Sequence, residues 1–160
     1  MTSQTVQGGE GFNVEDLKIN NNTFTNVSYL YGEANGSASG TIVFHTNAGT
    51  AQATNIVHDN IEITNNTIND YHGVAVNIGN AKNVTVSGNK FGVTSDMTRL
   101  SRECAIYANY SENITIENNE FGDARADITG AICYDADTVT NITVGTNTYA
   151  CSADKQVVIQ

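Results

Sequence analysis

Most of the side chains that could carry out chemistry fall in three short segments of the sequence. These segments are residues 69–73, 92–104 and 122–130, and they hold Asp70 and His72, then Asp96, Arg99 and Arg102, and then Arg125 and Asp127. Carboxylates beside Arg and His can serve as general acid and base at a glycosidic bond. Alternatively, an Arg could neutralise a uronate carboxylate while a base removes the adjacent proton. Ion pairing between neighbouring loops would use the same groups and requires no substrate.

Each segment leads into a short apolar strand, and polar residues recur at matching places on these strands. The strands are 42–45, 74–77, 106–109 and 132–135. Side chains alternate along a strand, so we expect positions 42, 74, 106 and 132 to point inward. Two outward rows then follow: Val43, Ala75, Tyr107 and Cys133, and His45, Asn77, Asn109 and Asp135. The second row offers hydrogen bonds along a shallow groove in which Tyr107 could stack on a sugar ring. An ordinary solvated sheet face would carry a similar row.

A fivefold internal repeat indicates what positions these strands. Its pattern is Asn or Asp, apolar, variable, apolar, two variable residues, Asn, variable and large apolar. The copies begin at Asp16, Asn60, Asn83, Asn113 and Asn141. The first two apolar residues share one face of a strand. The later Asn sits at a sharp bend, where we expect the left-handed conformation that Asn tolerates, and its amide can hydrogen-bond to its equivalents in the copies above and below.

The spacing of the copies predicts the fold. Their first apolar residues lie 44, 23, 30 and 28 residues apart. A period of this size, with three short strands per turn, predicts an all-β fold: a right-handed parallel β-helix solenoid of about five to six coils, with an Asn ladder at its turns. An antiparallel sandwich would show hairpin turns and an 8–12-residue strand rhythm, and it leaves the Asn register unexplained.

The repeat also sets the expected domain boundaries. We expect a lead-in at 1–14 and a single β-helix domain at 15–160, with an exposed loop near 31–40 in the long first interval. An open solenoid end exposes apolar core and unpaired backbone. The domain is therefore expected to be part of a longer solenoid or to dock against a partner.

Composition and charge exclude several classes of protein. Asn (22) and Thr (20) make up about a quarter of the 160 residues; both form helices poorly and suit strands and turns. The formal net charge of −10 repels phosphate backbones and anionic lipids, so we expect neither nucleic acid nor membrane as a partner. No apolar run approaches the roughly 20 residues that a membrane helix needs.

The repeat resembles those of the pectin-lyase-like β-helix superfamily, which includes polygalacturonases, other glycoside hydrolases, pectate and alginate lyases, and phage tailspikes. Residues 69–76 (NDYHGVAV), followed by 83–86 (NVTV), are similar to the polygalacturonase pattern of an Asn-Thr-Asp-Gly loop, a strand and an Asn-Val-Thr-Ile strand. In that family the catalytic carboxylates lie in this loop and on the strand's outer face, which implies an acid or base role for Asp70. The family's Gly-Asp-Asp loop and Arg-Ile-Lys have no counterpart here, and residues 71–73 match its Gly-His-Gly only in part.

Four aspartates near the third segment raise the question of a metal. Asp123, Asp127, Asp135 and Asp137 are hard oxygen ligands of the kind that Ca²⁺ takes. Their spacing matches no EF-hand and no nonapeptide calcium repeat. We therefore expect no metal or cofactor, with Ca²⁺ as the alternative.

The three cysteines suggest no special chemistry from sequence. The spacing of Cys104, Cys133 and Cys151 matches neither a zinc site nor a disulfide framework. We interpret them as ordinary small residues of the core or edge. The Asn-X-Thr sequons at Asn83, Asn113 and Asn141 follow from the repeat, and we interpret them as structural.

Two functions remain open at this stage. The first is a carbohydrate-active β-helix, a glycoside hydrolase or polysaccharide lyase. Asp70, His72, Asp96 and Asp127 would then be catalytic. The residues that bind a polysaccharide or oligosaccharide would be His45, Asn77, Arg99, Arg102, Tyr107, Asn109, Arg125 and Asp135. The second is a non-catalytic glycan-binding or structural module of an extracellular or phage surface protein, with further coils or self-association completing it. Both place the protein outside the cell or at its surface, with any export signal outside this sequence.

Overall fold

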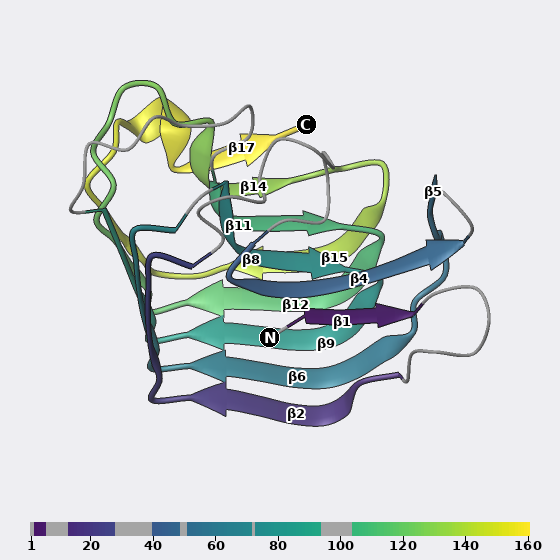
Figure 1. Ribbon diagram of the computed structural model, residues 1–160. Helices are drawn as coiled ribbons and strands as arrows, with labels where there is room; N and C mark the ends of the chain where they lie inside the picture. Colours follow the sequence, from purple (N-terminus) through teal and green to yellow (C-terminus); the bar gives the residue numbers. More distant parts are fainter. Residues whose placement is uncertain (1, 6–12, 28–39, 49–50, 72, 94–103) are drawn as a thin grey trace.

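The computed structural model describes residues 2–5, 13–27, 40–48, 51–71, 73–93 and 104–160 (Figure 1). Within them the chain winds through three sheets in turn, so that equivalent strands of successive coils pair in parallel. The first sheet contains β1 (Thr2–Thr5), β4 (Ile42–Ala48), β8 (Val74–Gly79), β11 (Cys104–Asn109), β14 (Gly130–Tyr134) and β17 (Val157–Ile159), with β5 (Ala51–Gln52) antiparallel to β4.

The other two sheets complete each coil. The second sheet contains β2 (Glu15–Asn20), β6 (His58–Thr64), β9 (Ala81–Ser87), β12 (Ser111–Glu117) and β15 (Val139–Val144). The third contains β3 (Thr23–Thr25), β7 (Thr67–Asn69), β10 (Lys90–Gly92), β13 (Glu120–Phe121) and β16 (Thr148–Tyr149). A 3-10 turn, η1 (Ala153–Lys155), precedes β17. The predicted parallel β-helix is therefore confirmed, and the antiparallel sandwich is wrong.

The core consists of inward rows that repeat from coil to coil. Ile61, Val84 and Ile114 lie opposite one another across β6, β9 and β12 and are at most 1% exposed. In the third sheet, the rings of Phe91, Phe121 and Tyr149 stack with centroids 5.1 and 5.2 Å apart. Burying one such side chain stabilises the fold by roughly 1.5–3 kcal/mol, so the repeated apolar positions account for the solenoid.

An Asn ladder joins the turns between the second and third sheets, as predicted. Asn66 donates to Asn89 Oδ1 at 3.0 Å, and Asn89 donates to Asn119 Oδ1 at the same distance. The amide of Asn89 also binds the carbonyl of Ile63 at 2.8 Å. These Asn side chains are buried, and the ladder supplies the partners that buried amides require.

The left-handed residues of these turns are not the ladder residues themselves. Positive φ angles occur one position earlier, at Asn21, Asn65, Gly88 and Asn118. The repeat's first position is also left-handed, with φ of 54° or 55° at Asp16, Asn60, Asn83, Asn113 and Asn141. The ladder Asn is thus selected by its hydrogen bonds, whereas the first position is selected by backbone conformation, because Asn and Asp tolerate αL better than other side-chain-bearing residues.

The register of the first sheet differs from the expected one in β8. Ile42 lies opposite Val76, not Val74, and Asn77 lies opposite Val43 and Tyr107. Ala75 and Val76 both contact the core, whereas Val74 belongs to a small outer cluster. The strict inward and outward alternation of side chains therefore fails at the start of β8. Asn77 does not lie in the predicted row with His45, Asn109 and Asp135.

Two further expectations concern chain segments rather than register. Residues 2–5, in the expected lead-in, form β1 and pair with β4. The expected loop at 31–40 lies outside the described residues except for Gly40. In the part of the chain that the structure describes, no helix has the length and apolarity needed to span a membrane.

Candidate functional site

The outer face of the first sheet, where a substrate groove was expected, is closed. His45, Asn77, Tyr107 and Asn109 are 3%, 2%, 4% and 7% exposed. A sugar ring could not stack on Tyr107 at this exposure without rearrangement of its surroundings. These residues therefore do not line an open groove in this structure, and their role in substrate binding stays a prediction.

Gln52 covers part of this face. Its Nε2 donates to Asn109 Oδ1 at 3.0 Å, and Asn109 Nδ2 donates back to Gln52 Oε1 at 2.8 Å. Gln52 Nε2 also lies 3.0 Å from Asn80 Oδ1. A Cβ added at Gly79 would lie 2.9 Å from Gln52 Nε2, so glycine makes room for this side chain. Gln52 lies outside the repeat, which gave no signal of this contact.

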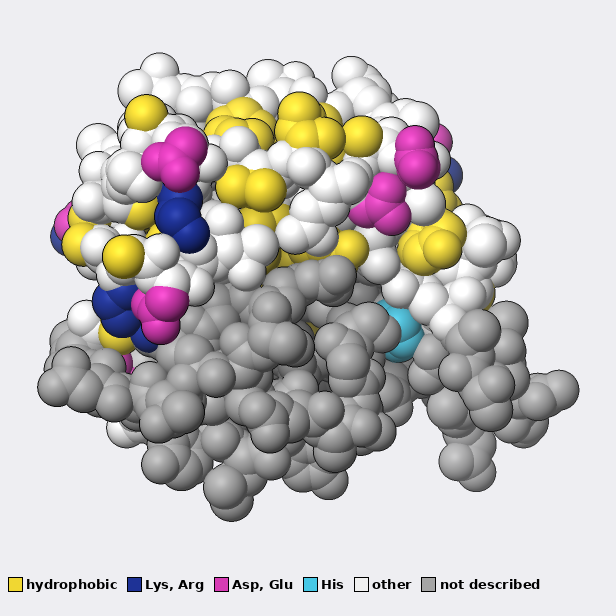
Figure 2. Space-filling model, turned by 90° about the horizontal axis from the view of Figure 1, so that it is seen from above, with side chains coloured by type: hydrophobic (Ala, Val, Ile, Leu, Met, Phe, Trp, Pro, Cys, Tyr) yellow, Lys and Arg dark blue, Asp and Glu magenta, His cyan; other side chains and the backbone are white. Residues whose placement is uncertain are grey.

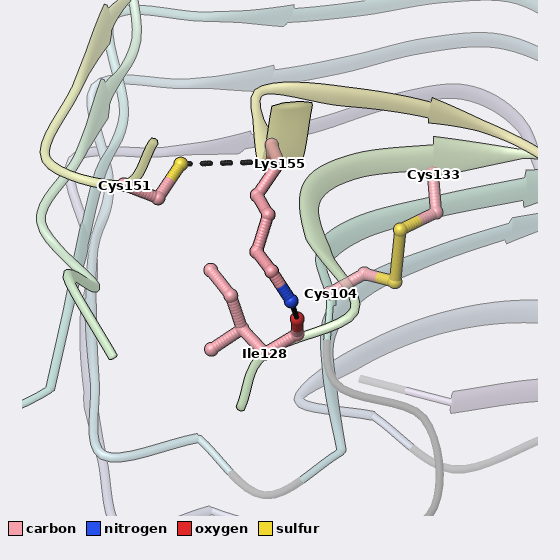
Figure 3. Close-up of a disulfide and its surroundings, with 5 residues drawn as sticks. All are labelled: Cys104, Ile128, Cys133, Cys151 and Lys155. Atoms are coloured by element: carbon pink, nitrogen blue, oxygen red, sulfur yellow. Dashed lines mark hydrogen bonds between the residues drawn. A yellow bond between two sulfur atoms is a disulfide. The ribbon is translucent and has the colours of Figure 1, made fainter. Parts of the chain in front are cut away.

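A disulfide joins Cys104 and Cys133 on the same outer face, across β11 and β14 (Figure 3). Their sulfurs belong to the outer cluster with Val74 and Tyr107. Cys151 is a buried free cysteine, and its Sγ lies 3.5 Å from the carbonyl of Lys155. The interpretation of Cys104 and Cys133 as ordinary small residues is wrong, because parallel pairing brings together cysteines 29 residues apart that no local spacing connects.

The loop before β14 uses its charges internally. The guanidinium of Arg125 binds both carboxylate oxygens of Asp123, with Nε to Oδ1 at 2.7 Å. The Arg125 backbone N–H donates to the same carboxylate. Asp127 is exposed. Arg125 thus forms a bidentate pair within its own loop, as the ion-pair alternative raised above expects, and its contact with a substrate stays a prediction.

The predicted catalytic residues are not assembled in the described part of the chain. Asp70 is 6% exposed and has a left-handed backbone. Its loop precedes β8, whereas the loop of Asp127 precedes β14, and β11 lies between these strands. Two strand spacings, about 10 Å, therefore separate the two loops. His72, Asp96, Arg99 and Arg102 lie outside the described residues.

The acidic residues show no metal-binding arrangement in the ranges that the structure describes. No group of three or more His, Cys, Asp or Glu side chains there could hold an ion. The Asp135 carboxylate accepts the backbone N–H of Asp137 at 3.0 Å, while Asp123 binds Arg125. Asp135 is partly buried and directly follows β14, where this bond closes a turn; its contact with a ligand stays a prediction.

Every Lys and Arg in the described residues already has a partner. Lys18 pairs with Glu62 at 3.0 Å, Lys82 with Asp59 at 3.3 Å and Lys90 with Glu120 at 3.5 Å. Lys155 Nζ donates to the carbonyl of Ile128 (Figure 3). The hydrogen bond from Asn83, together with Lys82, lowers the pKa of Asp59. Among the described cations, Lys155 alone lacks a carboxylate partner in these contacts, and its ammonium is held by a backbone carbonyl.

His58 is a buried polar residue that sequence reasoning missed. Its Nδ1 accepts the backbone N–H of Val14 at 3.3 Å, and its Nε2 lies 3.4 Å from Thr46 Oγ1. Burial, and secondarily the nearby His45, lowers the pKa of His58. A neutral imidazole with hydrogen on Nε2 satisfies both contacts. His58 therefore has a structural role beneath the closed face.

The outer face of the second sheet is polar and regular. Thr85, Thr115 and Thr143 lie opposite one another across β9, β12 and β15. Two residues earlier, exposed Asn113 donates to Asn83 Oδ1 at 3.1 Å, and Asn141 donates to Asn113 at 2.6 Å. These bonds support the structural interpretation of the sequon Asn residues. The sequence carries a signal of this row, because Thr occupies the third position of the repeat in three of its five copies.

The comparisons with known proteins agree with this architecture. The family described as the right-handed β-helix region matches residues 6–156. No curated protein and no solved structure shows significant similarity to the chain.

Proposed function

Since the chain belongs to the right-handed β-helix family, we propose that it is a glycan-binding β-helix domain that does not cleave its ligand. The closed outer face of the first sheet carries this proposal. The residues expected to form a catalytic groove are buried there, and Gln52 and Asn109 satisfy each other.

Both carbohydrate-cleaving reactions need groups that the described residues do not present. Glycoside hydrolysis uses two carboxylates that face one glycosidic bond. Asp70 is buried and Asp123 is paired with Arg125, which leaves Asp127 as the one exposed carboxylate of these two loops within the described residues. A lyase that neutralises a uronate needs an available cation, and the described Lys and Arg residues are engaged.

The disulfide supports a location outside the cytoplasm or at the cell surface. Disulfides such as Cys104–Cys133 persist in oxidising compartments and are rare where thiols are kept reduced. Extracellular polysaccharides are available in the same compartments. Location and ligand class are therefore consistent with each other.

A panel of soluble polysaccharides tests the proposal. Affinity electrophoresis measures retardation, and the same incubations are read for new reducing ends and for the ultraviolet absorbance of unsaturated products. We expect retardation by at least one polysaccharide with neither cleavage signal. Asp70→Asn and Asp127→Asn should bind as the wild type does.

Other outcomes contradict the proposal in different ways. New reducing ends would identify a hydrolase, and unsaturated products would identify a lyase. A folded protein that no polysaccharide retards would exclude glycan binding and favour a structural module.

A further inference from the structure

The second sheet presents the most regular open polar surface of the described residues, which we call the Thr/Asn face: Asn83, Thr85, Asn113, Thr115, Asn141 and Thr143. Val84, Val86, Ile114 and Ile116, which alternate with these residues, are at most 1% exposed. The polar side chains therefore point away from the core. Parallel pairing spaces equivalent residues by about 4.8 Å along the solenoid.

The three hydroxyls of this face are available for a ligand. Within the described residues, no hydrogen bond involves Oγ1 of Thr85, Thr115 or Thr143. A hydroxyl can donate one hydrogen bond and accept two. The row therefore offers one hydrogen-bond donor and two acceptor positions on each strand. The spacing between strands is comparable to the length of one sugar residue in an extended glycan.

The neighbouring amides are held in place before any ligand arrives. Asn113 donates to Asn83 and accepts from Asn141, and Asn83 Nδ2 donates to Asp59 Oδ1 at 2.7 Å. Each of these bonds uses one N–H, so a second N–H of each amide remains. Ligand binding would therefore order few side chains, which lowers its entropic cost.

The charges of this surface indicate the class of ligand. The protein carries a formal net charge of −10, and the lysines of the second sheet, Lys18 and Lys82, are paired with Glu62 and Asp59. An anionic glycan would meet like charge without an unpaired cation. A neutral glycan would meet hydroxyls and amides that match its own hydroxyl groups.

We infer that the Thr/Asn face is the glycan-binding surface, and that its ligand is a neutral, extended polysaccharide. This inference rests on the proposed function and adds the surface and the chemical class. The contact covers β9, β12 and β15, on a different sheet from the closed face.

A matched pair of triple variants tests the location. The first, Thr85→Val, Thr115→Val and Thr143→Val, removes the three hydroxyls and keeps the β-branched shape. The control, Thr23→Val, Thr67→Val and Thr148→Val, removes three hydroxyls from the outer row of the third sheet. A third variant, Thr115→Lys, places a long side chain on the Thr/Asn face and leaves its other hydroxyls.

Binding is measured by affinity electrophoresis and calorimetry with laminarin, galactomannan and xyloglucan, and with polygalacturonate and alginate as anionic polymers. We expect the wild type to prefer a neutral polymer. The first triple variant should lose roughly tenfold or more in affinity, from three lost hydrogen bonds. The control should change less than about twofold, and Thr115→Lys should bind more weakly than the wild type. All variants should keep the wild-type melting temperature within a few degrees, by analogy with surface changes.

The outcomes separate this inference from the function on which it rests. If the wild type binds a neutral glycan and both Thr115→Lys and the first triple variant bind equally well, the location is wrong while glycan binding stands. Preference for polygalacturonate or alginate would overturn the chemical class. No binding to any polymer would overturn the proposed function itself.

Discussion

Gln52 and Asn109 exchange two amide hydrogen bonds, at 3.0 and 2.8 Å, although 57 residues separate them in sequence. The contact fastens β5 over the outer face of the first sheet. It joins a segment outside the repeat to a strand two coils further along, and it helps to close the face where a groove was expected.

Replacing Gln52 should destabilise the protein. Gln52→Ala leaves buried Asn109 without this partner and removes a contact to Asn80, so we expect a loss of about 1–3 kcal/mol in the free energy of unfolding. Urea denaturation followed by circular dichroism measures it. Lys90→Gln serves as control, since it alters only an exposed ion pair of the third sheet. Equal stability of Gln52→Ala and the wild type would show that the amide pair contributes nothing net.

Removing a ladder Asn should destabilise the protein more at Asn89, in the middle of the buried ladder, than at Asn147, its last described member. Asn89→Ala removes bonds to Asn66, Asn119 and the carbonyl of Ile63 and leaves buried groups unsatisfied, so we expect a loss of about 3 kcal/mol or more. Asn147→Ala should cost about 1 kcal/mol, because water can reach this half-buried position. Chemical denaturation of both variants gives the comparison, and similar losses would contradict it.

His58 should make the protein acid-sensitive. Burial and the nearby His45 lower the pKa of His58 in the folded state, whereas an unfolded His titrates near 6.5. Below about pH 6.5 the unfolded chain binds a proton that the folded chain excludes, so this contribution to stability is present above that pH and is lost as the pH falls.

The variant His58→Gln isolates this effect. Unfolding free energies at several pH values between about 5 and 8 should fall less steeply with acid in His58→Gln than in the wild type. The variant will also change packing, but a packing change shifts stability at every pH alike. Identical pH slopes for the two proteins would contradict the assignment of His58 as a neutral buried imidazole.

The disulfide gives a prediction about thiol chemistry. Under non-reducing denaturing conditions, Cys151 alone should react with a thiol reagent, and all three cysteines should react after reduction. The double variant Cys104→Ser and Cys133→Ser should lose roughly 3–4 kcal/mol in the chain-entropy estimate for a loop of this length. Cys151→Ala should leave the disulfide intact. Reaction of three thiols before reduction would show that the bond does not form.

The repeat predicted the solenoid because its apolar and Asn positions satisfy the same packing and hydrogen-bond requirements in every coil. It could not predict how outer surfaces are covered. Gln52 and His58 act through contacts between segments that the repeat does not relate, and Cys104 meets Cys133 only after the coils have stacked. The predicted register of β8 was wrong by two residues, because a period of two cannot distinguish Val74 from Val76 as the partner of Ile42.

The exposed amide stack has a direction. Asn141 donates to Asn113, Asn113 to Asn83 and Asn83 to Asp59, and in a separate pair Asn60 donates to Asp16 at 2.5 Å. Asp16 and Asp59 each accept a hydrogen bond and donate none, so a carboxylate fits where each run of amides ends. Asn113 has an amide on either side and must both donate and accept. An aspartate in its place could accept from Asn141 but could not donate to Asn83, so it would interrupt the run.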